Sequence, residues 1–216
     1  MTATIRSKRH TAPLLLIAAL AIGLIGLAPA SAAQANSASN ATATAASAAA
    51  AQPTSSRAWI AKAAISQIGK RETGNNLYPK TYKLNNDVMR PAAWCGVFAN
   101  WAWAKGNASK RPNMKGKGVD QGHWATYWQK WGKKNNRWSP IGNRNVGVGD
   151  AVVYGTYPAS RHVGIVVGVK YDKNHKATQV RTVEGNVSDK VTDTGWRKIT
   201  ALTGGGAKAT GFVSPF

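Results

Sequence analysis

Helical and strand-like patterns occupy separate parts of this 216-residue sequence. Apolar residues at helical spacing come first, in residues 59–68, 91–103 and 124–131. Short runs rich in β-branched residues follow, at 151–154, 162–169, 180–184 and 196–202, with a weaker one at 211–213. Helices followed by strands are typical of an α+β fold, whereas parallel sheets need the two to alternate. We therefore predict a single domain in which N-terminal helices pack on an antiparallel sheet.

Residues 1–33 have the organisation of a secretory signal peptide. Three basic residues precede an uncharged apolar run from Leu14 to Leu27, and small residues at 28–32 fit a cleavage site. The run is short for crossing a bilayer, and no basic residues follow it as an anchor. We therefore expect a cleaved signal, no stable membrane anchor, and a secreted protein that is extracellular or associated with a cell wall.

Residues 34–56 contain almost only Ala, Ser, Thr, Asn and Gln, without a charge or a large apolar side chain. Such a segment cannot build a core and is predicted to be a flexible linker. Residues 57–216 remain for the folded part. This length suffices for one well-formed core but not for two full-sized domains.

The chain is strongly basic, with 29 Lys and Arg against 8 Asp and Glu and a formal net charge of +21. The basic residues are spread over the predicted domain, and an exported protein with this charge is suited to anionic polymers of the bacterial wall. Basic stretches near aromatic residues at 110–117 and 130–137 also suit nucleic acid. No nucleic-acid-binding motif accompanies them, so we expect no nucleic-acid partner.

The chain has one cysteine, Cys95, which excludes an internal disulfide framework and a cysteine-rich zinc site. Pro91 precedes a helical pattern, and this places Cys95 in the first turn of the predicted helix. Free N–H groups and the positive end of the helix dipole favour a thiolate there, and they can also hold an oxyanion. The alternative is a small buried core residue, which is the commonest role of a single cysteine.

Three histidines follow the signal, and His162 differs from the other two because it opens the strongest predicted strand. A strand end beside a loop can fix a general base and keep it accessible, whereas His123 and His175 are interpreted as structural or surface residues. Glu184 ends a later strand, and alternation would point Glu184 and Asn186 to the same side, toward His162. One of them would then orient the imidazole, although a glutamate before a turn is more often simply solvated.

Four motifs occur in a fixed order: Ala93-Trp94-Cys95-Gly96-Val97-Phe98, Gly149-Asp150-Ala151-Val152-Val153-Tyr154, His162-Val163-Gly164-Ile165-Val166 and Glu184-Gly185-Asn186. Together they resemble a CHAP domain, the cysteine, histidine-dependent amidohydrolase/peptidase family of bacterial wall hydrolases. The resemblance covers residues 57–216. The related NlpC-type endopeptidases usually carry Asp-Cys-Ser-Gly around the nucleophile, which this chain does not match.

The resemblance implies a papain-like fold with Cys95 as nucleophile, His162 as base, and Glu184 and Asn186 as acidic and amide partners. It further implies a monomeric, cofactor-free peptidoglycan hydrolase that cleaves an amide bond, as an N-acetylmuramoyl-L-alanine amidase or a peptide endopeptidase. The alternative is a non-catalytic cationic protein on the same fold, with a wall-binding or antimicrobial role.

Further expectations concern metals and aromatic residues. Some members of the family bind calcium through acids upstream of the cysteine. Only Glu72 and Asp87 stand there, so no metal site is expected. Trp94 adjoins the cysteine and is the candidate to line a substrate cleft. The tryptophans at 124, 128 and 131 have the spacing of a core-facing stripe.

Overall fold

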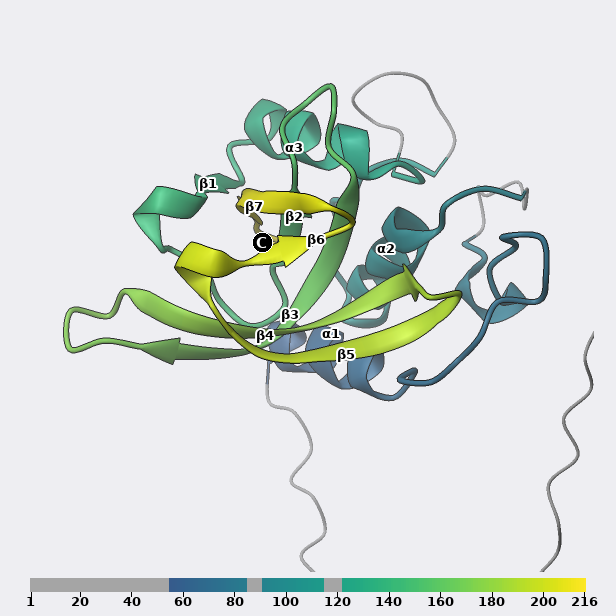
Figure 1. The fold of residues 1–216 in the computed structure, drawn as a ribbon, viewed down its shortest axis with the longest axis horizontal. Helices are drawn as coiled ribbons and strands as arrows, with labels where there is room; N and C mark the ends of the chain where they lie inside the picture. Colours follow the sequence, from purple (N-terminus) through teal and green to yellow (C-terminus); the bar gives the residue numbers. More distant parts are fainter. Residues whose placement is uncertain (1–54, 85–90, 115–121) are drawn as a thin grey trace, which may run out of the picture. The chain divides into compact units, whose positions relative to one another are not determined.

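Helices precede strands along the chain, and the α+β class is confirmed (Figure 1). The computed structural model describes residues 55–84, 91–114 and 122–216. The predicted signal peptide and residues 34–54 of the predicted linker lie outside the described residues. Helix α1 (Ser56–Ile65) begins one residue before the expected domain boundary. Its N-cap is Ser55, whose hydroxyl accepts the N–H of Ala58 at 3.2 Å.

Two further α-helices, the short 3-10 helices Lys80–Tyr82, Ile141–Asn143 and Ile199–Ala201, and one sheet complete the described architecture. The α-helices are α2 (Cys95–Lys105) and α3 (Ala125–Lys134). The strands are β1 (Trp138–Pro140), β2 (Ala151–Tyr154), β3 (His162–Tyr171), β4 (Ala177–Val187), β5 (Lys190–Lys198), β6 (Thr203–Gly204) and β7 (Ala207–Val213). The main sheet order is β1-β7-β2-β3-β4-β5, with β6 paired to β7. Every pairing of named strands is antiparallel, which confirms the predicted kind of sheet.

The two faces of the sheet carry two separate apolar clusters. Strand β2 shows the division, because Ala151 and Val153 join the cluster that contains the helices, whereas Val152 and Tyr154 join the opposite one. Strands β2, β3, β4 and β7 supply most of the second cluster, together with Ile199 and Leu202. Because both faces are covered, β2 is buried along its whole length.

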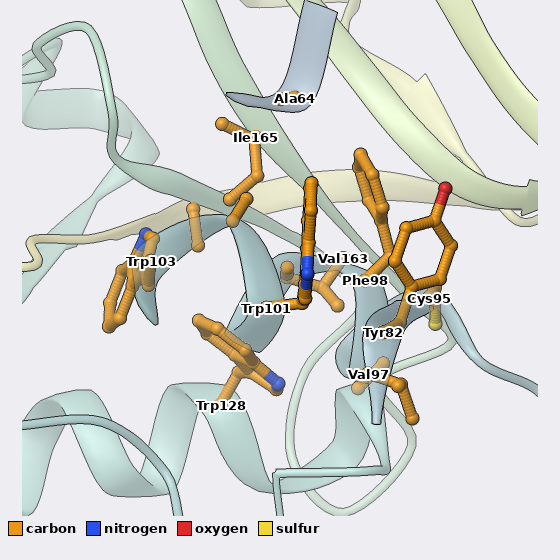
Figure 2. Packing of buried hydrophobic residues seen from close by; sticks show 14 of the residues in the cluster. Ala64, Tyr82, Cys95, Val97, Phe98, Trp101, Trp103, Trp128, Val163 and Ile165 are labelled. Atoms are coloured by element: carbon orange, nitrogen blue, oxygen red, sulfur yellow. The ribbon is translucent and has the colours of Figure 1, made fainter. Parts of the chain in front are cut away.

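Aromatic side chains fill much of the helix-side cluster (Figure 2). The ring of Tyr82 lies 5.0 Å from that of Trp101 and 5.5 Å from that of Phe98, measured between ring centroids. Trp128 and Trp131 are buried as predicted. Trp124 is 42% exposed, because α3 starts only after it and it occupies the N-cap position.

Gly96 is the second residue of α2 and has no room for a side chain. A Cβ atom there would lie 2.4 Å from the carbonyl oxygen of Gly122 and 2.6 Å from that of His123. In this chain the backbone at 122–123 takes up that space and thereby fixes the start of the helix.

We expect Gly96→Ala to lower the free energy of unfolding by about 2 kcal/mol, because overpacking forces the backbone at 122–123 to shift. Urea denaturation measures this change. The matched control is Gly142→Ala, since a Cβ at Gly142 meets no atom within 4 Å. Equal stability of the two variants would show that the contact at Gly96 is unimportant.

Candidate active site

Three predicted site residues from different elements meet in the structure. Cys95 is the first residue of α2, His162 is the first residue of β3, and Glu184 lies within β4. The charge of His162 acts directly on the Cys95 thiol, and Nε2 of His162 lies 3.0 Å from Oε2 of Glu184. The N–H of Nε2 is poorly aligned with that oxygen, so the contact is mainly an ion pair. All three residues are buried.

The start of α2 sets the surroundings of the Cys95 sulfur. Trp94 occupies the N-cap position with φ −116° and ψ 16° and makes no side-chain cap, although its carbonyl oxygen accepts the N–H of Phe98 at 3.0 Å. The backbone N–H groups of Gly96 and Val163 face the sulfur and lower the pKa of the thiol. Cys95 lies at the edge of the aromatic cluster (Figure 2). A thiolate here is therefore stabilised from both the helix and the sheet.

Electrostatics favour the charged form of the cysteine–histidine pair. Burial alone would raise the pKa of the Cys95 thiol, but the His162 charge and the hydrogen bonds to the sulfur hold that pKa below its ordinary value. Burial opposes the charge of His162, yet the contacts with the Cys95 thiolate and with Glu184 raise its pKa to about 10. The geometry thus supports a thiolate–imidazolium pair at neutral pH.

Three donors bind Oε1, the second carboxylate oxygen of Glu184. None of the three was predicted from the sequence. Oε1 accepts the hydroxyl of Tyr154 at 2.5 Å, the hydroxyl of Thr182 at 2.6 Å and Nη2 of Arg197 at 2.8 Å. Burial raises the carboxyl pKa, but the contacts with His162, Thr182 and Tyr154 outweigh it and bring it to about 2. Glu184 is therefore a buried carboxylate rather than a solvated one.

Glycine allows this close packing. A Cβ atom at Gly164 would lie 2.5 Å from Cγ of Glu184, so only glycine fits at this position of the neighbouring strand β3. A Cβ at Gly205 would likewise lie 2.6 Å from Cβ of His162. The backbone around Gly205 therefore covers one side of the histidine and limits its movement.

Asn186 does not join the other predicted site residues. The expected alternation fails because β4 has a bulge between Glu184 and Val187 and Asn186 has a left-handed φ of 62°. Its amide nitrogen donates to Oδ1 of Asn76 at 3.1 Å instead. Asn186 thus connects β4 to the Asn-rich turn near Glu72.

Trp94 does not line an open cleft, which corrects the sequence-based expectation. Its side chain is fully buried and packs against Tyr82, with the ring centroids 6.0 Å apart. Its indole N–H donates to Oε2 of Glu72 at 3.3 Å. Trp94 has no accessible ring face, so it packs in the core beside the site and cannot stack on a substrate.

Other predicted features are placed as follows. Asp150 shapes its turn by binding Arg57 at 2.6 Å and accepting the N–H of Gly147 at 2.8 Å. His123 is buried, and His175 lies in the turn before β4. Asp87 lies outside the described residues. Within the described residues no group of three or more His, Cys, Asp or Glu is placed to hold a metal ion. No helix among them has the length and apolarity needed to span a membrane.

No protein-family model, no curated protein and no solved structure matches this chain. A buried thiolate, an imidazolium that can return a proton, and a carboxylate that stabilises this imidazolium are the parts needed for acyl transfer through a covalent thioester. The backbone N–H groups at the start of α2 adjoin the sulfur, and such groups can hold an oxyanion.

Proposed function

We propose that this protein is a secreted peptidoglycan hydrolase that cleaves an amide bond by a cysteine mechanism, on a papain-like fold of the CHAP type. The observation that carries the proposal is the contact chain from Cys95 through His162 to Glu184. The net charge of +21 and the predicted export signal support a wall substrate, since the wall is rich in anionic polymers.

In the proposed reaction the Cys95 thiolate attacks the carbonyl carbon of the scissile amide. N–H groups at the start of α2 stabilise the oxyanion. The imidazolium of His162 donates its proton to the departing amine, and the C–N bond breaks to leave a thioacyl-enzyme. Neutral His162 then takes a proton from water, which attacks the thioester and releases the carboxylic acid and the thiolate. Glu184 stabilises the imidazolium in both steps.

Two bond types fit this chemistry equally well. An N-acetylmuramoyl-L-alanine amidase separates the stem peptide from the glycan, whereas an endopeptidase cuts within stem or bridge peptides. Mass spectrometry of digested purified wall distinguishes them. An amidase releases complete stem peptides and leaves bare glycan strands, and an endopeptidase leaves glycan strands that still carry peptide stumps.

We expect one of these two product sets to accumulate, together with new amino groups, when the protein acts on purified peptidoglycan. Heat-denatured protein serves as the control for spontaneous release. Digests without new amino groups from any wall preparation would contradict the proposed function. A product in which only glycosidic bonds are cut would contradict it as well.

A second candidate function is a non-catalytic cationic wall-binding or antimicrobial protein on the same fold. The observation in its favour is that Cys95 is only 4% exposed and His162 only 5%. Such a protein would sediment with insoluble wall without releasing amines. Its thiol would also react slowly with iodoacetamide near neutral pH, as an ordinary buried cysteine does.

A further inference from the structure

Four charges of alternating sign follow one another through the site: the Cys95 thiolate, the His162 imidazolium, the Glu184 carboxylate and the Arg197 guanidinium. They come from α2, β3, β4 and β5 respectively. We propose that Arg197 is a positioning residue, which keeps Glu184 ionised and directs its free oxygen at His162. This inference rests on the proposed function only for its role in hydrolysis, because the reactivity of the thiol can be tested without a substrate.

The contacts of Arg197 fix the orientation of the carboxylate. Nη2 of Arg197 lies 2.8 Å from Oε1 of Glu184, 2.8 Å from the hydroxyl of Tyr154 and 2.7 Å from that of Thr182. Both hydroxyls also donate to Oε1. Three donors on one oxygen leave Oε2 as the oxygen that faces His162, and they oppose rotation of the carboxylate.

Arg197 is itself held in place. Its Nη1 donates to the carbonyl oxygen of Thr203, in the short strand β6 that precedes the glycine turn over His162. Its guanidinium carbon lies 5.9 Å from the centre of the Tyr154 ring. Its side chain is only 23% exposed, so solvent screens its charge in part but does not remove it.

Charge balance explains why the site needs this cation. Buried charges are tolerated when they are paired, and the row of four carries no net charge. Without Arg197 the other three charges sum to −1, which favours uptake of a proton by Glu184 or by the Cys95 thiolate. The other titratable group in contact with Glu184 is Tyr154 on β2. Burial raises the pKa of Tyr154 well above its ordinary value, so it stays neutral and cannot replace the arginine.

The test is the rate at which iodoacetamide alkylates Cys95 as a function of pH. Cys95 is the only cysteine in the chain, so the labelling reports on this site alone. In Arg197→Gln we expect the acidic limb of the profile to move up by about one pH unit, which lowers the rate at pH 5 about tenfold. Arg197→Lys retains the charge without the forked geometry and should recover part of this loss.

The matched control is Arg181→Gln. Arg181 joins the same two strands through its ion pair with Asp193 but does not contact Glu184. Its alkylation profile should coincide with that of the unmodified protein. If both arginine variants give the unmodified profile, the positioning role of Arg197 is refuted. If both shift it equally, the effect belongs to strand stability and the proposal is refuted as well.

Tyr154→Phe keeps the proposal testable if Arg197→Gln does not fold, because it removes one donor to Oε1 and keeps the ring. We expect its acidic limb to move in the same direction, with a loss of about threefold in rate at pH 5. An unchanged profile in a folded Tyr154→Phe protein would overturn the proposal. A shifted profile in a protein that never releases amines from wall would instead refute the proposed function and leave the role of Arg197 intact.

Discussion

Replacement of Cys95 by alanine is expected to lower the release of amines from purified peptidoglycan by about three orders of magnitude or more. The thiolate is the only group in the site that can form the thioester, and loss of a nucleophile removes most of the rate of a hydrolase that works through a covalent intermediate. The measurement is the initial rate of amine release at equal protein concentration. Binding to insoluble wall should be retained, because the basic surface is unchanged.

The fold should survive this substitution. Removal of one buried sulfur costs about 1 kcal/mol in unfolding free energy, which urea denaturation can verify. Cys95→Ser is the matched variant, since it keeps a similar size but offers a hydroxyl that His162 cannot deprotonate to the same extent. Unchanged amine release in either folded variant would show that the hydrolysis does not use this residue.

Much of the fold can be predicted from local pattern. The β-branched run at 162–169 lies within β3, and the strand predicted at 151–154 has the bounds of β2. Strand β1 was not predicted, because it has three residues and ends in a proline. Its pairing with β7 stabilises it, and such a partner distant in sequence leaves no periodic signal of its own.

Only some residues of the site can be predicted from the sequence. Cys95, His162 and Glu184 stand at element ends or in short motifs, where local chemistry is informative. Two of the missed donors did carry a signal: Thr182 lies two residues before Glu184 and so shares its face, and Tyr154 is the partner of His162 in the β2–β3 register.

The positions of Arg197 and Asn186 cannot be predicted from the local sequence. The pairing of β4 with β5 shifts register between Arg181 and Val183 and again between Glu184 and Val187. Each bulge changes which side chains share a face of the sheet, and no local residue pattern predicts where a bulge occurs. The position of Arg197 beside Glu184, and of Asn186 away from His162, therefore depends on tertiary packing.

The second large effect concerns Glu184→Gln, which keeps the size of the side chain but removes its charge. The amide oxygen would remain with the three donors at Oε1, so the NH₂ group would face Nε2 of His162. Two donors cannot face each other, and the imidazole would have to accept at Nε2 and remain neutral. We expect amine release to fall by up to about 10⁴-fold, the loss seen when the carboxylate that orients the histidine of a catalytic triad becomes an amide.

The same variant should change stability in a pH-dependent way. The Glu184 pKa is lowered from 4.5 to about 2 on folding, so the carboxylate contributes stability above about pH 4.5 and loses it as the pH falls toward 2. This shift corresponds to about 3 kcal/mol. We expect Glu184→Gln to be less stable than the unmodified protein by about that amount at pH 6, with the gap narrowing below pH 4.

Urea denaturation between pH 3 and pH 7 measures this gap, and Asp193→Asn is the matched control. Asp193 also pairs with an arginine between β4 and β5, but its side chain is 25% exposed against 2% for Glu184. Solvent screens the exposed pair, so its loss should cost less than about 1 kcal/mol. Only a buried and strongly acidic carboxylate gives a large loss of stability that disappears in acid. Equal losses in the two variants, or a loss for Glu184→Gln that stays constant down to pH 3, would therefore show that Glu184 is not ionised in the folded protein.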